Sequence, residues 1–298
     1  MPTVRELNTA PNLMGLFGKA ALAEVRKHDQ PKRGLPDTEY LRSNVKVDRA
    51  NLANYDRVCG FRQSDELPAT YPHILSFPLQ AKLMSDDDFP FGMVGIVHVA
   101  NRITQLRPVR ATEPLSLRVH ARNLRPHDKG NQFDVVSEAL VDGEVVWTDV
   151  STYLRRGRPS GPASAPEPEP GDTPSPAAPL PPPDAVWHVG DDFGRRYASV
   201  SGDHNPIHLH PLSARLFGFK RAIVHGMWSK AHTLAAFEGR LPAGFTIDVR
   251  FKLPIMLPSK VALRSAATAD GGWRFDLRNE RNGKPHLEGT ITPVPRVP

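Results

Sequence analysis

The chain has 298 residues, of which 39% are hydrophobic and 23% are charged, and its formal net charge is +6 at pH 7. This length suffices for one large domain or two ordinary ones with a buried core, and no apolar run approaches the roughly 20 residues of a membrane span. The basic residues are scattered and no basic run alternates with aromatic residues, which argues against nucleic acid and fits acidic small molecules or acidic carrier proteins.

Two features of the N-terminal region bear on where the protein works. The stretch LMGLFGKAALAEV is apolar on one helical face, but Lys19 interrupts it and no convincing cleavage site follows. It is therefore predicted to be a surface amphipathic helix rather than a signal peptide. Cys59 is the single cysteine, which excludes an intramolecular disulfide and predicts a cytoplasmic location. In its apolar context, Cys59 is expected to be a small core residue.

A proline-rich segment divides the chain. Residues 157–183 hold 11 of the 31 prolines and have almost nothing to bury. This composition predicts an extended, exposed linker. The expected domains are an N-terminal half, residues 1–156, and a C-terminal half, residues 184–298.

The two halves repeat each other. YDRVCG, which starts at Tyr55, matches YASVSG, which starts at Tyr197. Further on, TYPHILSFPLQAKLM lines up with AIVHGMWSKAHTLAA. The identities are few, but their order holds over about 100 residues, and a repeat of that length indicates two copies of one domain.

Each half also predicts the same order of elements. A helical entry segment precedes a long apolar helix, and consecutive strands with alternating residues follow. Asp142-Gly143 and Asn282-Gly283 are strong hairpin signals between two of these strands in each half. The expected fold class is α+β, with an antiparallel sheet wrapped around a long helix in each copy. The two copies are expected to pack sheet to sheet as a pseudo-dimer.

The repeat is broken by an insertion in the second half. The segment from Gly202 to His225 is ten residues longer than its counterpart from Gly60 to His73. The N-terminal half has Phe61 opposite Asp203 and nothing opposite His208. The halves therefore repeat in structure, whereas the reactive groups occur only in the second.

The inserted segment brings together residues that handle protons. Asp203 and His208 are separated by Asn205-Pro206, which forces a turn and can bring both side chains to one small volume. A carboxylate and an imidazole that face one water form a general acid–base pair near neutral pH. Asn205 can hold the turn by bonding to the backbone.

A second group with chemical potential lies at the start of the next helix. Gly226 is the first residue of the apolar stretch GMWSKAHTLAAFEG, so its backbone N–H points out of the helix N-terminus and is a natural oxyanion donor. An acid–base pair with an oxyanion donor, and no nucleophile or cofactor motif, suits proton abstraction beside a carbonyl. Elimination or addition of water at the adjacent carbon fits well.

Less specific interpretations of these residues stay open at this point. Asp203 and His208 could form an inert turn, and His208 with His210 could be a metal pair, although no further ligand cluster is evident. His225 could be a capping or core histidine. Ser201 lacks the second glycine of a nucleophile elbow and is better explained as a turn or capping serine.

The stretch YASVSGDHNPIHLHP, with Ala214 and AIVHGM downstream, resembles the hydratase 2 motif of the MaoC-like family. These proteins are (R)-specific enoyl-CoA hydratases and (3R)-hydroxyacyl thioester dehydratases of the hot-dog fold. The resemblance covers nearly the whole chain, because a degenerate first repeat is similar to the two-repeat hydratases. TYPHILSFPLQAKLM with HVANRITQLRP looks like actinobacterial long-chain 3-hydroxyacyl dehydratases. A double hot-dog fold is implied.

The resemblance also implies roles for individual residues. Asp203 and His208 would be the catalytic dyad, Asn205 the positioning residue, and the Gly226 amide the oxyanion donor. At His210 the family often has Asp or Asn. The implied reaction is reversible hydration of a trans-2-enoyl thioester to the (3R)-3-hydroxyacyl thioester in fatty-acid metabolism. No cofactor and no metal are implied.

The expected partner is an acyl thioester of CoA or of acyl carrier protein, and a homodimer is considered. The Phe- and Met-rich stretch FPLQAKLMSDDDFPFGM suits a long aliphatic tail. Two other functions are weighed. A non-catalytic acyl-thioester binding or scaffold subunit of a synthase complex is disfavoured by the intact Asp203/His208 pair. A thioesterase needs a carboxylate on the central helix, where Glu238 near the helix end is the candidate.

Overall fold

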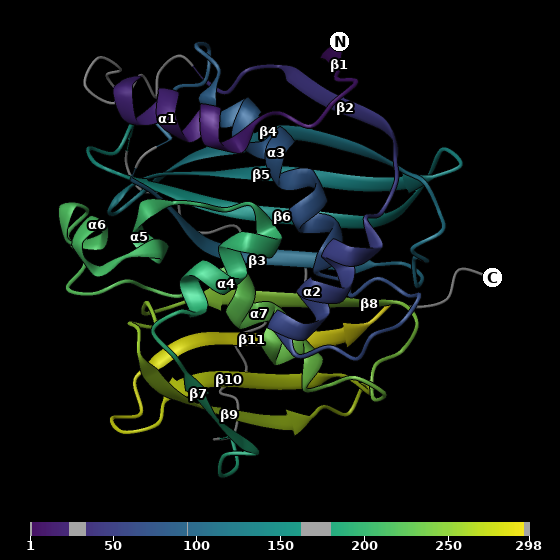
Figure 1. Cartoon of the computed structure of the whole chain (residues 1–298), viewed down its shortest axis with the longest axis vertical. Helices are drawn as coiled ribbons and strands as arrows, with labels where there is room; N and C mark the ends of the chain where they lie inside the picture. Colours follow the sequence, from purple (N-terminus) through teal and green to yellow (C-terminus); the bar gives the residue numbers. More distant parts are fainter. Residues whose placement is uncertain (1, 24–33, 94, 162–179, 295–298) are drawn as a thin grey trace.

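The computed structural model describes residues 2–23, 34–93, 95–161 and 180–294. The strands among these residues form one sheet of eleven strands (Figure 1). The strand order is β1-β2-β4-β5-β6-β3-β8-β11-β10-β9-β7. Neighbouring strands are antiparallel except for β1 and β2, which pair in parallel. The helices lie over one face of the sheet (Figure 1). The predicted α+β class is confirmed.

The two halves contribute strands in the same arrangement. Numbered within its own half, each set follows the order 1-3-4-5-2, and β1 (Thr3–Glu6) is an addition at one edge. The predicted double hot-dog fold therefore appears as two copies of one strand order. The strands of the first copy are β2 (Thr38–Val45), β3 (Ile96–Gln105), β4 (Leu115–His127), β5 (Gly130–Val141) and β6 (Glu144–Arg156). Those of the second are β7 (Ala185–Val189), β8 (Phe245–Phe251), β9 (Ser259–Ala267), β10 (Trp273–Asn279) and β11 (Pro285–Pro293).

The copies join edge to edge rather than with one sheet stacked on the other, which corrects the expectation of sheet-to-sheet packing. Strand β3 pairs with β8 in antiparallel register from Ala100–Arg250 to Gln105–Phe245. Arg102 and Asp248 form an ion pair across this seam, 2.5 Å from Nη2 to Oδ2. The second strand of each copy, β3 or β8, is an edge strand of that copy. Pairing β3 with β8 satisfies the backbone hydrogen-bonding groups of both edges and makes the sheet continuous.

The helices follow the repeat as well. Helix α2 (Arg49–Cys59) corresponds to α4 (Phe193–Ser201), and both end at a glycine in the left-handed conformation, Gly60 with φ 85° and Gly202 with φ 75°. A non-glycine residue adopts that conformation at a cost. The apolar helices of the two copies are α3 (Tyr71–Ser85) and α7 (Gly226–Ala235). Helix α1 (Leu13–Ala23) precedes the first copy, in line with the predicted N-terminal helix.

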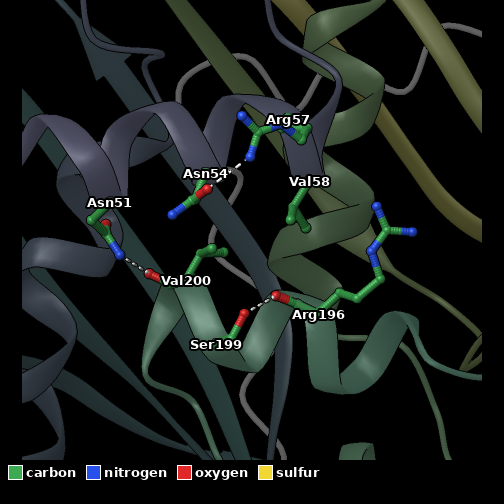
Figure 2. A pocket seen from close by; sticks show the side chains of 7 residues that line it. All are labelled: Asn51, Asn54, Arg57, Val58, Arg196, Ser199 and Val200. Atoms are coloured by element: carbon green, nitrogen blue, oxygen red, sulfur yellow. Dashed lines mark hydrogen bonds between the residues drawn. The ribbon is translucent and has the colours of Figure 1, made fainter.

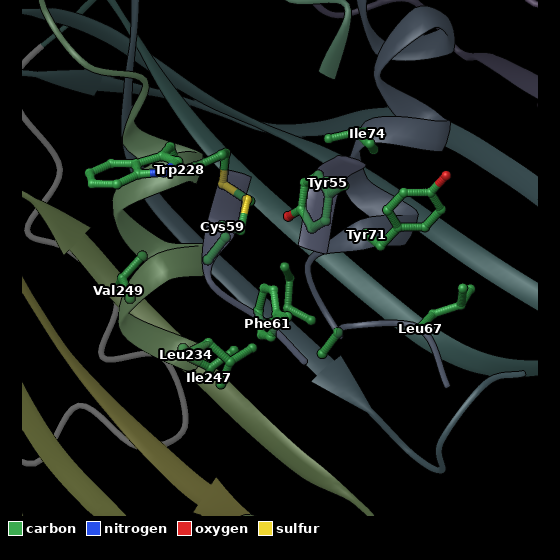
Figure 3. Close-up of a cluster of buried hydrophobic side chains, with 14 of the residues drawn as sticks. Tyr55, Cys59, Phe61, Leu67, Tyr71, Ile74, Trp228, Leu234, Ile247 and Val249 are labelled. Carbon is green, nitrogen blue, oxygen red and sulfur yellow. The ribbon is translucent and has the colours of Figure 1, made fainter. Parts of the chain in front are cut away.

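A shared hydrophobic core ties the copies together (Figure 3). Tyr55 and Cys59 of α2 lie in the same buried cluster as Trp228 of α7. The Trp228 indole donates to the carbonyl of Val58 at 3.0 Å, and His232 Nδ1 donates to the carbonyl of Cys59 at 2.8 Å. Cys59 is fully buried and free, as expected for a small core residue, and burial raises the pKa of its thiol.

The extra residues of the second copy fold into two short helices, α5 (Pro206–Leu209) and α6 (Pro211–Leu216). The greater part of the predicted linker, residues 162–179, lies outside the described residues, so the domain boundaries stay a prediction. Among the helices that the structure describes, none has the length and apolar character to cross a membrane.

Candidate active site

The loop after α4 carries Asp203 in a defined turn. The backbone N–H of Asp203 donates to Ser201 Oγ at 3.2 Å, and the N–H of Asn205 donates to Asp203 Oδ1 at 3.1 Å. Asn205 in turn caps α5, because its Oδ1 accepts from the N–H of Ile207 at 3.3 Å. Both predictions for this loop are confirmed: Ser201 is a turn serine, and Asn205 bonds back to the backbone.

His208 is held in one orientation and one tautomer. Its side chain is buried on α5, and Nδ1 lies 2.8 Å from the carbonyl oxygen of Ile223. A carbonyl only accepts, so Nδ1 carries the proton and Nε2 has a bare lone pair. Burial lowers the pKa of His208 below its usual value, and the nearby charge of Asp203 opposes this shift. His208 is therefore neutral at neutral pH, as a general base must be.

His225 completes the cluster, although the sequence favoured only a capping or core role. It is the N-cap residue of α7, is 3% exposed, and stacks on His208 with 3.6 Å between ring centroids. Its Nε2 donates to the carbonyl of Asp203 at 2.9 Å and lies 3.8 Å from Asp203 Oδ2. Burial, together with the positive charge that His208 has when protonated, holds the pKa of His225 well below its usual range. His225 thus anchors the Asp203 loop to the start of α7.

One polar atom from each of Asp203, His208 and His225 lies within 4.8 Å of the other two. The turn therefore brings the predicted dyad to one small volume. Three such groups can also be considered as metal ligands. The two imidazoles, however, are stacked with an interplanar angle of 26°, so their in-plane lone pairs do not converge on one point. His210, the other member of the proposed metal pair, instead caps α6 by accepting from the N–H of Leu212.

Gly226 starts α7 directly after His225, as predicted. The first amides of a helix have no acceptor within it, and the helix dipole favours negative charge there. The Phe251 ring of β8 lies against Gly226: a Cβ atom at this position would be 3.0 Å from Phe251 Cε1. Because Gly226 has no side chain, the space between its amide and the Phe251 ring stays free; any Cβ atom would fill it. The N–H of Gly226 can bind an oxyanion next to the dyad.

The corresponding place in the first copy has lost these groups. Phe61, opposite Asp203 in the repeat, is buried and stacks on Tyr55. His73, opposite His225, donates from Nδ1 to Asp149 Oδ2 at 2.5 Å inside the protein. Burial alone would raise the pKa of Asp149, but the charge and hydrogen bond of His73 hold it below its usual range. The pair is part of a buried polar network, not of an open acid–base site.

That network reaches the helix that carries Gly226. Lys230 of α7 is fully buried and donates to the side-chain oxygen of Asn101 at 2.5 Å and to the carbonyl of Ile247 at 3.0 Å. Asn101 in turn donates to Asp149 at 2.6 Å. Burial lowers the pKa of Lys230 to about 7. These bonds fix α7 against β3 and β8, the two strands of the seam.

Glu238 and a cavity between two helices both lie apart from this site. Glu238 lies beyond the end of α7 and accepts from the N–H of Arg62 at 3.0 Å, so it is not on the central helix, where a thioesterase needs its carboxylate. A cavity of about 370 Å³ lies between α2 and α4 (Figure 2). It contains none of the predicted site residues and is lined by Asn51, Asn54, Arg57, Val58, Arg196, Ser199 and Val200.

Known proteins with similar sequences include dehydratases and hydratases of acyl thioesters. Residues 182–290 match the family model described as "MaoC like domain". The chain is 41% identical over 271 residues to 3-hydroxyacyl-thioester dehydratase X of Mycobacterium tuberculosis, covering 91% of this chain and 93% of that protein. It is 34% identical over 77 residues to an (R)-specific enoyl-CoA hydratase of Aeromonas caviae, which covers 24% of this chain and 58% of that one.

Solved structures show the same relationship. The crystal structure of HtdX of Mycobacterium tuberculosis superposes with a TM-score of 0.75 at 38% identity, covering 86% of this chain and 100% of that one. A MaoC-like dehydratase from Phytophthora capsici shares the fold with a TM-score of 0.68 at 20% identity, covering 86% and 95% of the two chains. From the relative that it matches over nearly its whole length, together with the domain model, the chain belongs to the MaoC-like dehydratase family.

Proposed function

We propose that the protein catalyses the reversible hydration of a trans-2-enoyl thioester to the (3R)-3-hydroxyacyl thioester, in fatty-acid metabolism. The observation that carries this proposal is the convergence of Asp203 and His208 beside the first amide of a buried helix. The related dehydratase from Mycobacterium tuberculosis and hydratase from Aeromonas caviae support the reaction class. We assign the catalysis to the second repeat, residues 184–298, with residues 1–156 as a degenerate repeat and 157–183 as a linker.

The geometry supports a division of roles. The thioester oxygen accepts from the N–H of Gly226, which stabilises the enolate that forms when water adds to C3 in hydration or when C2 loses its proton in dehydration. In the hydration direction, the bare Nε2 of His208 takes a proton from water while the water oxygen bonds to C3, and Asp203 delivers the proton to C2. In the dehydration direction, Asp203 takes the C2 proton and protonated His208 gives its proton to the leaving hydroxyl. After hydration, His208 returns its proton to solvent and Asp203, with a quarter of its side chain exposed, takes one up, which restores the starting state of both groups.

The proposal includes the group that carries the acyl chain, the direction of the chain and the cellular location. The carrier is CoA or acyl carrier protein, and the acyl chain runs from Gly226 toward the first repeat, whose matching place holds a buried His73–Asp149 pair and no open acid–base site. We retain the cytoplasm as the expected location, because the single cysteine forms no disulfide. A long acyl chain is expected from the apolar residues of the first repeat.

The direct test is to incubate the protein with crotonyl-CoA and with trans-2-dodecenoyl-CoA and to follow the loss of enoyl absorbance. Chiral analysis of the product should give the (3R) alcohol. Asp203→Asn and His208→Gln should each lower turnover by about 10²–10⁴-fold, since each removes one end of the proton path. His210→Asn is the matched control, because it changes a neighbouring histidine and keeps a side chain able to cap α6.

The outcomes separate the alternatives. Tight binding of the enoyl thioester without turnover would favour the non-catalytic binding protein. Release of free thiol, detected with a thiol reagent, would favour a thioesterase. Activity above a tenth of wild type in either dyad variant would refute the residue assignment while leaving the reaction class intact.

A further inference from the structure

Helix α1 lies next to the candidate active site, which its place in the sequence did not indicate. Its first residue, Leu13, packs on Gly202: the Leu13 Cδ1 atom is 2.8 Å from the point where a Cβ of Gly202 would lie. Gly202 ends α4 and directly precedes Asp203. Helix α1 therefore begins in contact with the loop that carries the proposed acid–base pair.

One helical turn further on, α1 contacts the apolar helix of the first repeat. The Phe17 ring lies 6.5 Å from the Phe77 ring of α3, and Phe77 lies 6.2 Å from the ring of His73. Figure 1 shows α1 beside α3, over the same face of the sheet. Helix α1 thus extends from the Asp203 loop to the first repeat.

A row of ring contacts leads back from this point to the proposed oxyanion donor. His98 of β3 stacks on His73, with 6.3 Å between centroids, and lies 5.1 Å from the ring of Phe251. Phe251 in turn lies against Gly226. The contacts of α1 therefore connect with both sides of the candidate site, the Asp203 loop on one side and the Gly226 amide on the other.

Three apolar residues in the first half of α1 lie outside the protein core. Leu13, Leu16 and Phe17 are only partly buried, and none of them is a member of either buried hydrophobic cluster among the described residues. Met14, on the same helix, is 64% exposed and is not one of these partly buried residues. Partly exposed apolar side chains beside a polar reaction centre gain free energy when an apolar ligand covers them.

We propose that α1 forms one wall of the acyl-chain site and that Leu13 and Phe17 determine the preference for long chains. A crotonyl group ends near Gly226 and the dyad, whereas a longer chain continues along the ring contacts and passes beneath α1. The inference rests on the proposed hydratase function and specifies which residues hold the distal methylenes.

The test compares chain lengths in three single variants. Leu13→Ala and Phe17→Ala should each lower kcat/KM for trans-2-dodecenoyl-CoA by about tenfold, chiefly through KM, because contacts with distal methylenes are lost. Activity on crotonyl-CoA should stay within about twofold of wild type. The crotonyl group has no distal methylenes to lose contact with Leu13 or Phe17, and neither side chain binds the reacting atoms. Met14→Ala, which shortens an exposed side chain of the same helix, should leave both substrates unchanged.

Other results would overturn the inference. An equal loss on both substrates would show that α1 only stabilises the Asp203 loop, and no loss on the long substrate would show that the chain takes another path. Thermal unfolding of each variant should match that of wild type, and a large fall in Tm would likewise place Leu13 and Phe17 in the core. Absence of hydratase activity in the wild-type protein would count against the proposed function instead.

Discussion

Gly194 of α4 and His208 of α5 touch through their backbones. A methyl group on Gly194 would lie 1.8 Å from the carbonyl oxygen of His208, well inside van der Waals contact. The absence of a side chain at one residue thus allows the short helix with the imidazole to rest on α4. The position of His208 depends on Gly194 as well as on its own hydrogen bond.

Gly194→Ala should therefore lower hydratase activity strongly while the rest of the fold stays intact. The added methyl must push α5 away from α4, and a displacement of about 1 Å at a catalytic group can cost roughly 10² in rate. Ser199→Ala, a change on an exposed position of the same helix, is the control. Steady-state kinetics with crotonyl-CoA would measure the effect, and wild-type turnover in Gly194→Ala would contradict the dependence.

Gly226→Ala tests the space beside the oxyanion donor. Gly226 is not among the glycines with positive φ, so alanine can adopt its backbone conformation, but the new methyl would meet the Phe251 ring at 3.0–3.2 Å. We expect kcat/KM to fall by about tenfold or more, as when an oxyanion donor is misplaced. The double variant Gly226→Ala/Phe251→Leu should recover part of the loss, because leucine makes room. Failure of the double variant to recover would show that the methyl blocks the substrate itself.

The pH dependence of hydration should reflect the lowered pKa of His208. Hydration needs the neutral imidazole, and burial lowers the pKa of His208 from 6.5, so the neutral form persists to lower pH than in a free histidine. The acidic limb of kcat/KM for crotonyl-CoA is therefore expected to have its midpoint below pH 6.5. A midpoint above that value would exclude neutral His208 as the group that accepts the proton from water.

Stability should fall on acidification through a half-buried histidine outside the dyad. Burial, reinforced by the charge of His73, lowers the pKa of His98 from 6.5 to about 3. Between these values the unfolded chain binds a proton that the folded chain does not, so the free energy of unfolding decreases as pH falls, by about 1.4 kcal/mol per pH unit for one such group. In His98→Leu this contribution disappears.

Urea unfolding at several pH values between 7 and 4 would measure the slope in wild type and in His98→Leu. His188→Leu, which removes an exposed histidine, is the matched control. Identical slopes in wild type and His98→Leu would mean that His98 takes up a proton without unfolding. The variant also replaces a ring that packs on Tyr153, so the comparison concerns the pH slope and not the absolute stability.

Local chemistry made part of the site predictable. Pro206 cannot continue α4, so the chain turns after Gly202 and starts again as α5 with Asn205 as its cap, which brings Asp203 and His208 together. The start of α7 at Gly226 follows from the apolar pattern. The stacking of His225 on His208 could not be read in this way, because it depends on how the helix N-terminus packs on α5. The alignment of His225 with His73 in the repeat was the available signal, since a histidine at both places suggests a role beyond capping.

The larger errors concern relations between distant segments. The repeat predicted two sheets but not which edges would meet, because strand alternation defines faces and says nothing about edges. The contact of Gly194 with His208 and the position of α1 beside Gly202 likewise depend on packing between elements. A glycine such as Gly194 does not by itself reveal which neighbouring element lies against it.

The seam between β3 and β8 has a consequence for how the chain is assembled. The ladder, the ion pair of Arg102 with Asp248 and the shared core hold the two repeats by non-covalent contacts. A protein made as two separate polypeptides, residues 1–161 and 180–298, would therefore associate as a heterodimer with the same eleven-stranded sheet. Its activity would then depend on subunit concentration, whereas in the single chain the covalent connection keeps the two partners at a fixed one-to-one ratio.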